Sequence, residues 1–510
     1  MIGEFAARVQ KGLELLERER PEEAEQSFRA ALAINPRDDQ LLHLLGIAQL
    51  RQGRAEDAVK SVQRAISLTK RKADYHNTLG CALRDVGRVD EAIGCFERAL
   101  KLAPEAADAR FNFGRALLQD RRYAEAEALF GGLVARDPTD LEAIAGLAGA
   151  KWIAGNFEAA LAVFRDGIAR VPQNRYFHFM YAELLLALGD FDNGWREYLE
   201  RPSRAVMLAH AQRRNDDTAE LARLPARLDG RTFKLHCEQG LGDELFWLRF
   251  VAQLRARGAH RIEAAVDLRL IGMVARSGIV DECVERSSRR LHDPEWIPAG
   301  DLPYLLGSNA SNIPPPLRLR PPEDRLAEID ARLEALPRPL IGLSWRAGTP
   351  PTHGAPHLSF RELPLDSFAA FVAKMPGTLL VLQRNPRPAE IERLAARAPG
   401  RVADFSLLND DLEGMLALLS RLDEYVGVSN TNMYLYAGVG GRGKVLVPSD
   451  VEFRWMARSA QSPWFPGFRV YRPGPERDWP AVYEQVLRDL SARRANDDRA
   501  QGDITFEDAR

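Results

Sequence analysis

One loop in the second half of the chain, Glu238-Gln239-Gly240-Leu241-Gly242-Asp243, combines a carboxylate with two glycines after a strand-like apolar segment. A carboxylate at the end of a strand can take a proton from a hydroxyl group and act as a general base. We predict that Asp243 is this base and that Glu238 is the second choice. Gly240 and Gly242 allow a substrate to approach the backbone closely. The alternative is that Asp243 only caps the following helix, since Asp is a preferred capping residue.

A second polar loop, Ser429-Asn430-Thr431-Asn432, lies between another strand-like segment and a helical one. Free backbone N–H groups and the helix dipole favour an anion at a helix N-terminus, and these side chains add further hydrogen-bond donors. We predict that the four residues Ser429, Asn430, Thr431 and Asn432 bind the phosphate groups of a donor substrate without a metal ion. An ordinary capped turn is the alternative.

Three further polar residues, Arg346, Arg361 and Gln383, stand close to strand ends in the same half. A guanidinium can bridge two phosphate oxygens in a fixed geometry, so Arg346 and Arg361 are candidate clamps for phosphate groups. Gln383 is predicted to contact the base or ribose of a nucleotide. The alternative for Arg361 is a surface ion pair with Glu362 or Asp366.

Metal and redox chemistry find no support in the sequence. No Asp-x-Asp pair stands at a strand end in the second half, so we expect neither a metal-bound diphosphate nor a cofactor. The four cysteines form no Cys-x-x-Cys pair and have no zinc spacing. His353 and His357 lie in a Pro- and Gly-rich loop, and we assign them no catalytic role.

The elements that must position these residues alternate between strands and helices from about residue 231. Strand-like segments lie at 232–237, 262–266, 340–345, 379–383, 402–404, 424–428 and 444–447, with helical patterns between them and at 479–492. This alternation is typical of parallel sheets with helices on both faces. We predict two α/β domains, 231–312 and 338–495, joined by a proline-rich linker at 313–337, with a ligand cleft between them. The polar tail 496–510 is predicted to be disordered.

The first 200 residues follow another pattern, in which a small residue returns every 34 positions. Ala24, Ala58, Ala92, Ala126 and Ala160 share one phase, with a glycine or alanine twelve positions earlier and a large apolar residue four positions later. This pattern resembles the tetratricopeptide repeat. We therefore predict an all-α solenoid over residues 1–201, followed by a linker at 202–230. The concave face of such a solenoid binds another protein chain.

Length and charge narrow the possible functions of the chain. A chain of 510 residues is too long to fold around a single hydrophobic core. Its net charge of −2 gives no overall positive potential that would attract nucleic acid. The first residues lack the pattern of a signal peptide, and no apolar run approaches the roughly 18 residues of a spanning helix. We expect a cytoplasmic protein that neither binds nucleic acid nor inserts into a membrane.

Three motifs together resemble the heptosyltransferase-like glycosyltransferases, which have the GT-B fold of two facing Rossmann-like domains. The loop that ends at Asp243 resembles their first loop, and the segment 428–438 resembles their donor loop. Glu452-Phe453-Arg454-Trp455, followed by 462–466, resembles the ending of bacterial proteins that join repeats to such a domain. The resemblance implies that Asp243 is the base and that a basic residue near Arg361 contacts the donor phosphates. Asn430 and Tyr434 depart from the family, which usually has Asp and His there.

The resemblance implies an inverting, metal-independent glycosyltransferase that moves a sugar from a nucleotide-sugar donor to a protein acceptor held by the repeats. Some bacterial proteins of this build glycosylate flagellin, which suggests flagellin as the acceptor and a nonulosonic acid as the sugar. Two alternatives stay open. The departures at Asn430 and Tyr434 suggest an adaptor with a degenerate transferase half. A transferase acting on lipopolysaccharide sugars would use the repeats only for localisation.

Overall fold

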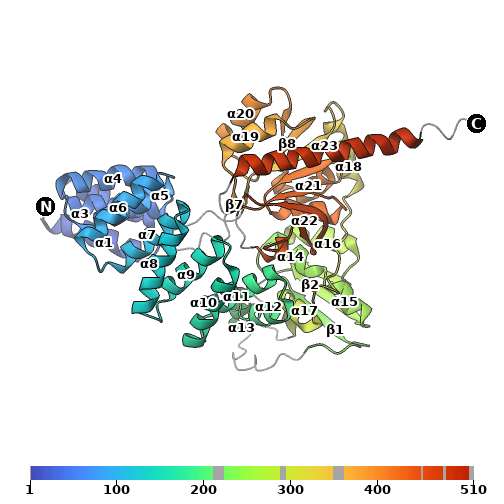
Figure 1. The fold of residues 1–510 in the computed structure, drawn as a ribbon, viewed down its shortest axis with the longest axis horizontal. Helices are drawn as coiled ribbons and strands as arrows, with labels where there is room; N and C mark the ends of the chain where they lie inside the picture. The colour runs from blue at the N-terminus through green and yellow to red at the C-terminus, as the bar shows by residue number, and fades with distance from the viewer. Residues whose placement is uncertain are drawn as a thin grey trace, which may run out of the picture. The chain divides into compact units, whose positions relative to one another are not determined.

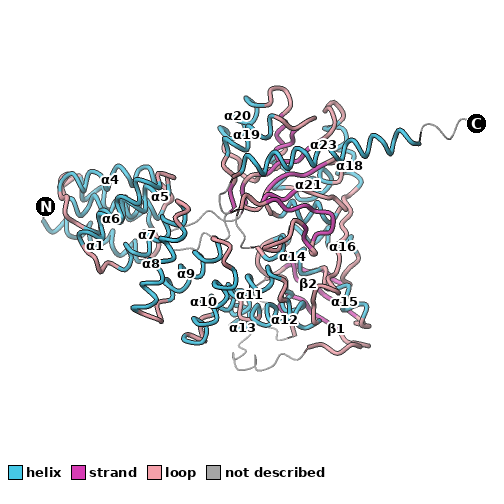
Figure 2. The backbone as a smooth tube through the Cα atoms, in the orientation of Figure 1, coloured by secondary structure: helices cyan, strands magenta, loops and turns pink. Residues whose placement is uncertain are grey.

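The computed structural model describes residues 2–210, 223–287, 295–347, 361–448, 452–474 and 478–504. Among these residues, two compact units can be distinguished: residues 2–172 form the first, and the second begins at Gln173. The first unit is helical, and the second combines helices with sheets (Figures 1 and 2).

The first unit consists of helix pairs that follow one another along the chain. Its helices are α1 (Ile2–Glu17), α2 (Pro21–Leu32), α3 (Asp39–Arg51), α4 (Ala55–Leu68), α5 (Ala73–Asp85), α6 (Val89–Leu102), α7 (Ala107–Gln119), α8 (Tyr123–Arg136), α9 (Leu141–Ile153) and α10 (Phe157–Arg170). Gly53, Gly87 and Gly155 have φ of 73–82° and lie in the turns between paired helices. Glycine adopts this left-handed conformation without strain, so each of these glycines allows the first helix of its pair to end.

The 34-residue pattern corresponds to close packing within each helix pair. A Cβ atom added to Gly12, Gly46, Gly80 or Gly114 would lie only 2.3–2.6 Å from a side-chain atom of the large residue sixteen positions later. Those large residues, Phe28, Val62, Phe96 and Phe130, have no exposed surface. The small residues therefore make room for the large ones, and this part of the chain is an all-α repeat solenoid, as the 34-residue spacing predicts.

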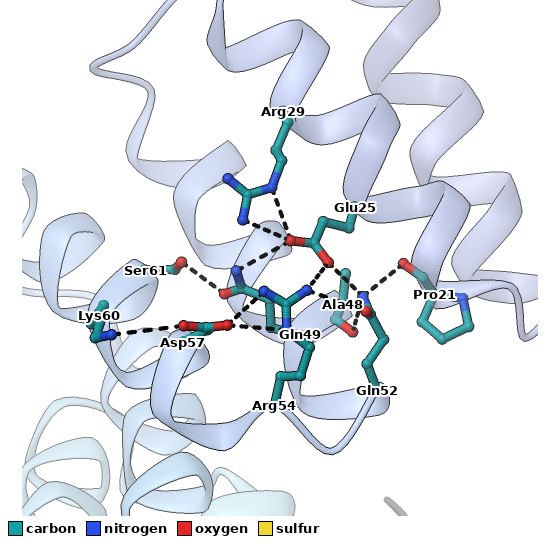
Figure 3. A network of polar contacts seen from close by, with 10 residues as sticks. All are labelled: Pro21, Glu25, Arg29, Ala48, Gln49, Gln52, Arg54, Asp57, Lys60 and Ser61. Carbon is teal, nitrogen blue, oxygen red and sulfur yellow. Dashed lines mark hydrogen bonds and ion pairs between the residues drawn. The ribbon is translucent and has the colours of Figure 1, made fainter.

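A polar network joins α2, α3 and α4 at one end of the first unit (Figure 3). Glu25 is 6% exposed and accepts hydrogen bonds from Gln52 at 2.8 Å and from Arg54 at 2.7 Å. Arg29 donates to the same carboxylate at 2.9 Å. Burial raises the pKa of Glu25, but these hydrogen bonds and the two positive charges outweigh burial, so the pKa lies below its ordinary value of 4.5.

The second unit begins with three helices, α11 (Arg175–Leu188), α12 (Phe191–Tyr198) and α13 (Pro202–His210). The sequence predicts a solenoid up to residue 201, which includes α11 and α12, and a linker at 202–230. In the structure their aromatic side chains pack among those of the α/β part. The Trp195 ring lies 6.3 Å from that of Trp247 and 5.7 Å from that of Trp464, measured between ring centroids. The last repeat therefore shares a core with the sheets.

The first sheet has four parallel strands in the order β3-β2-β1-β4. The strands are β1 (Thr232–His236), β2 (Arg261–Val266), β3 (Glu282–Glu285) and β4 (Trp296–Pro298), and the helices are α14 (Leu241–Leu248), α15 (Val251–Ala256), α16 (Ile271–Ser277) and α17 (Leu302–Leu306). The helical pattern predicted between the first two strand-like segments thus corresponds to two helices, α14 and α15. The alternation of strand and helix otherwise agrees with the prediction.

The second sheet has seven strands in the order β12-β13-β11-β10-β5-β8-β9, all parallel except β12 against β13. Its strands are β5 (Leu340–Ser344), β8 (Thr378–Val381), β9 (Val402–Asp404), β10 (Glu424–Gly427), β11 (Lys444–Leu446), β12 (Gln461–Ser462) and β13 (Phe465–Tyr471). A separate ribbon pairs β6 (Arg346–Ala347) with β7 (Arg361–Glu362). The helices are α18 (Glu323–Leu333), α19 (Leu365–Ala373), α20 (Pro388–Arg397), α21 (Leu412–Leu419), α22 (Thr431–Gly438) and α23 (Trp479–Ile504).

Helix α23 belongs to the core of the second sheet. Tyr483 stacks on Phe371 of α19 with ring centroids 4.4 Å apart, and Val486 is completely buried in the same cluster. The sequence predicts a helical pattern at 479–492 and disorder from residue 496. The helix instead packs on the second sheet and continues to Ile504, and residues 505–510 lie outside the described residues.

Candidate functional site

The two predicted loops meet in the structure, because the helices that follow them lie against each other. Helix α14 starts after β1, helix α22 starts after β10, and the two helices are in contact (Figure 1). A Cβ atom added to Gly242 would lie 2.9 Å from Cδ2 of Tyr434. Gly242 therefore permits a close approach, as predicted, but its neighbour is α22 of the other sheet.

Asp243, in the first turn of α14, makes two different contacts. Its Oδ2 accepts a hydrogen bond from the backbone N–H of Gly240 at 3.0 Å, which is the capping role that the sequence left open. Its Oδ1 accepts a hydrogen bond from Nη2 of Arg454 at 2.6 Å. The side chain keeps 26% of its surface exposed. Asp243 thus caps its own helix and also pairs with Arg454, which lies between β11 and β12 of the second sheet.

Arg454 is 7% exposed and lies among aromatic rings. Its guanidinium carbon is 4.5 Å from the ring centroid of Phe246 and 4.8 Å from that of Phe453. Burial lowers the pKa of Arg454, but the surrounding Tyr434, Asp243 and Glu452 raise it above its usual value. A charged guanidinium is therefore fixed next to the predicted base.

Glu452 connects this pair to the predicted donor side. Its Oε1 accepts hydrogen bonds from Ser429 at 3.0 Å and from the Tyr434 hydroxyl at 3.3 Å. Its Oε2 forms an ion pair with Arg361 at 3.0 Å, whereas the sequence analysis offered Glu362 or Asp366 as partners. Glu452, Arg454 and Tyr434 are each 7–8% exposed, so all three side chains are buried close to where the two loops meet.

Asn430 and Thr431 form the start of α22. The Asn430 side chain accepts a hydrogen bond from the backbone N–H of Met433 at 3.2 Å, and its amide donates to Oγ of Ser344 at 2.9 Å. Asn430 is thus the N-cap of α22, which is the capped turn considered as the alternative. Thr431, the first residue of the helix, is partly buried.

Gln383 and Asn432 are turned towards their own domain. Gln383 accepts from the backbone N–H groups of Trp345 and Arg346 at 3.0 and 2.8 Å. Its amide donates to the carbonyls of Arg346 and Arg384, both at 3.0 Å, so both ends of the side chain are used. The buried Asn432 amide donates to the Leu382 carbonyl at 3.2 Å. A nucleotide could use these side chains only by displacing existing bonds.

Arg346 and Glu238 are also held in ion pairs. Arg346 pairs with Glu390 at 2.6 Å and donates to the Asn385 carbonyl at 3.1 Å. Glu238 is 4% exposed and accepts a hydrogen bond from Nε of Arg201 at 3.0 Å. The second choice for the base is therefore part of a buried ion pair with the segment between α12 and α13. The loop that carries His353 and His357 lies outside the described residues.

Three charged residues of this cluster received no role from the sequence: Glu183, Glu452 and Arg454. The motif at 452–455 is part of the family resemblance, but the sequence indicates no partner for the charge of Glu452 or of Arg454. Glu183 lies on α11 and is the only acidic residue of that helix, a signal that could have drawn attention to it. Burial, together with the charges of Glu452 and Asp243, raises the pKa of Glu183 to about 8, against the opposing effect of Arg454.

Comparisons with known proteins support the repeat region. A tetratricopeptide-repeat family model matches residues 9–75, 77–140 and 147–201. The protein FlbA of Caulobacter vibrioides is 26% identical over 376 residues, and the match covers 66% of this chain and 60% of FlbA. The chain therefore spans less than two thirds of the length of this curated relative.

Solved structures of two repeat proteins are also similar to part of this chain. TTC0263, a tetratricopeptide-repeat protein of Thermus thermophilus, is 23% identical and has a TM-score of 0.31, covering 36% of this chain and 99% of its own. A repeat protein of Parabacteroides merdae is 20% identical with a TM-score of 0.35, covering 41% and 85%. Among the described helices, none combines the length and hydropathy needed to cross a membrane. Residues 9–201 thus carry tetratricopeptide repeats, and the chain is a distant relative of FlbA.

Proposed function

We propose that this protein is a glycosyltransferase that moves a sugar from a nucleotide-sugar donor to a protein held by its repeats. The observation that carries the proposal is the meeting of two strand–loop–helix units from different sheets. Gly242 of the first unit contacts Tyr434 of the unit that begins with Ser429. Asp243 of the first unit also pairs with Arg454, which lies in a segment beside the second sheet. The carboxylate of Asp243 thereby follows directly after the glycine that contacts the first turn of α22.

The chemistry of sugar transfer fits this arrangement. The acceptor hydroxyl must lose a proton as its oxygen attacks the anomeric carbon, and Asp243 is a partly exposed carboxylate that can accept it. Attack from the side opposite the leaving group inverts the anomeric centre. The leaving phosphates need positive charge, which Arg361 and the N-terminus of α22 supply without a metal ion. Arg361 is 22% exposed and has a carboxylate partner that a phosphate can replace.

The repeats supply the acceptor side of the proposal. Stacked tetratricopeptide repeats form an extended surface suited to a peptide or protein. We propose that the acceptor is a protein and that flagellin is the first candidate, as the resemblance to flagellin-modifying proteins suggests. Lipopolysaccharide sugars remain the alternative class of acceptor. A transferase that acts on them would not require this surface.

The test is the intact mass of candidate acceptors, flagellin among them, co-expressed with the wild-type protein or with Asp243→Ala. The proposal expects one added sugar mass with wild type and none with Asp243→Ala. Asp366→Ala is the matched control, because its side chain is 85% exposed and pairs with Arg393, which has no part in the proposed site. Equal modification by wild type and Asp243→Ala would refute the assignment of the base.

A second candidate is an adaptor whose transferase half no longer acts. It is favoured by the side chains of Arg346, Gln383 and Asn432, which are engaged with their own domain. The same experiment separates the two candidates. An adaptor would bind its partner through the repeats and leave the partner's mass unchanged.

A further inference from the structure

Donor groups from three segments of the chain converge on the carboxylate of Glu452. Its Oε1 accepts hydrogen bonds from Oγ of Ser429 at 3.0 Å and from the Tyr434 hydroxyl at 3.3 Å. Nη1 of Arg454 lies 3.7 Å from the same oxygen, and Nη2 of Arg361 lies 3.0 Å from Oε2. Guanidinium and hydroxyl groups are also the donors that a phosphate group uses. The carboxylate therefore lies where the surrounding groups suit an anion of another molecule.

Arg361 is the donor that a ligand can reach. Its side chain is 22% exposed, whereas the other three donor residues are at most 8% exposed. Within the part of the chain that the structure describes, Glu452 is the residue whose side chain pairs with the Arg361 guanidinium. An anion that enters from solvent thus meets Arg361 first and must compete with Glu452 for it.

The ion pair between Arg361 and Glu452 is poorly aligned. Although the two atoms lie 3.0 Å apart, Oε2 of Glu452 is buried and receives no well-aligned hydrogen bond from the described residues. A misaligned contact is much weaker than a straight hydrogen bond. Phosphate oxygens that accept two N–H groups of the guanidinium in line can therefore replace this carboxylate.

The other buried guanidiniums of the cluster have partners of their own. Arg454 donates to Asp243 at 2.6 Å. The buried Arg249 shares an aromatic ring with Arg454 and donates to the Trp464 carbonyl at 2.6 Å. Movement of the Glu452 carboxylate, or removal of its charge, therefore leaves neither of these two guanidiniums without a partner.

We propose that Glu452 competes with the phosphate groups of a nucleoside diphosphate for Arg361 and thereby speeds the release of this product. The carboxylate gives way when the diphosphate pairs with Arg361, and it returns to the guanidinium as the diphosphate leaves. Product release limits the turnover of many enzymes, so such a competitor raises turnover. Glu452 acts through Arg361 and is a positioning residue. The inference rests on the proposed function for the identity of the product, but the competition can be measured without sugar transfer.

Titration calorimetry of the full-length protein with UDP, GDP and inorganic pyrophosphate tests the competition. Glu452→Gln keeps an oxygen for Ser429 and Tyr434 but has no charge for Arg361. It should bind pyrophosphate and at least one nucleotide about tenfold more tightly, because one charge-assisted contact no longer has to be broken. If thermal unfolding shows that this variant does not fold, Glu452→Asp takes its place, and its shorter side chain should also allow tighter binding. Unchanged or weaker binding in the folded variant, or binding of no probe, would overturn the proposal.

Two controls show whether the effect passes through Arg361. Glu362 is next to Arg361 in the chain, but its side chain is 44% exposed and lies 3.5 Å from Arg346. Glu362→Gln should therefore bind each probe within about threefold of wild type. In an Arg361→Ala background, the gain from Glu452→Gln should also fall below about threefold. A full gain without Arg361, or an equal gain in Glu362→Gln, would contradict the proposal.

Transfer assays separate the failure of this inference from the failure of the proposed function. In an active enzyme, Glu452→Gln should strengthen product inhibition by the nucleoside diphosphate about tenfold. Equal product inhibition in an active wild type and in Glu452→Gln would refute the inference and leave the proposed function standing. Tighter binding of the probes by Glu452→Gln, without transfer by the wild-type protein, would refute the function and leave the competition for Arg361 standing.

Discussion

Asp243 and Arg454 are 211 residues apart in the chain, yet their side chains are joined at 2.6 Å. The carboxylate belongs to the first turn of α14, and the guanidinium belongs to the segment between β11 and β12 of the other sheet. The pair therefore links the parts of the chain that contain the first and the second sheet, at the position of the candidate base. Whatever binds Asp243 must share it with Arg454 or displace Arg454.

Replacing Arg454 should destabilise the second unit. In Arg454→Met, Glu452 and the partly exposed Asp243 lose their common cation, and we expect a loss of about 2 kcal/mol in the free energy of unfolding. Chemical denaturation of the full-length protein measures it. Arg397→Ala is the control, since this exposed arginine lies on α20 and its loss should change stability by less than about 0.5 kcal/mol. Equal effects of the two variants would show that the ion pairs of Arg454 contribute nothing to stability.

The contact between α14 and α22 depends on a glycine. Gly242→Ala places a methyl group 2.9 Å from the Tyr434 ring, so the helices must separate, at a cost of about 1–3 kcal/mol. Removing the ring in Gly242→Ala/Tyr434→Ala should relieve the clash. The double variant should therefore be more stable than the sum of the two single changes predicts. Simple additivity would mean that the two helices do not touch in solution.

The repeat glycines can be tested within two neighbouring helices. Gly80→Ala brings a methyl group 2.6 Å from the Phe96 ring, and we expect a loss of about 1–3 kcal/mol. Gly94→Ala, on the paired helix, meets no heavy atom within 4 Å. It should be neutral or stabilise by up to about 1 kcal/mol, because alanine favours helix more than glycine does. Circular dichroism during thermal unfolding distinguishes the two outcomes.

The Glu25 network should make the repeats sensitive to acid (Figure 3). Because the pKa of Glu25 is lowered on folding, its stabilising contribution is complete above 4.5 and is lost as pH falls through the lowered value. Glu25→Gln should therefore lose less stability on acidification than wild type. Glu22→Gln, an exposed neighbour, should behave like wild type. A wild-type acid response in Glu25→Gln would contradict the assigned network.

Much of the fold could be predicted because its signals are local. The spacing of Gly80 and Phe96 defines a helix pair, and apolar runs such as that of β5 define the central strands. Short strands such as β4 and β12 escaped notice, since two or three residues carry no periodicity. Helices α11 and α12 are predicted to belong to the solenoid, because the sequence does not reveal that Trp195 packs against Trp464.

The candidate site was only partly predictable for the same reason. The loops with Asp243 and Ser429 have local signatures, and the structure brings them together through Gly242 and Tyr434. The sequence does not distinguish a Gln383 amide that binds a ligand from one that binds nearby backbone groups. In the structure the amide binds backbone groups. Arg454 and Glu183 depend on partners from distant segments, which no local pattern reveals.

Hydrogen–deuterium exchange with and without a panel of nucleoside diphosphates, UDP and GDP among them, tests the central claim most directly. The claim is that the loop before α14 and the loop before α22 serve one donor site. One nucleotide should slow exchange in both 238–245 and 428–434 over the same concentration range, and Arg361→Ala should weaken that response. Protection confined to one segment, or found in neither with every nucleotide of the panel, would contradict the account.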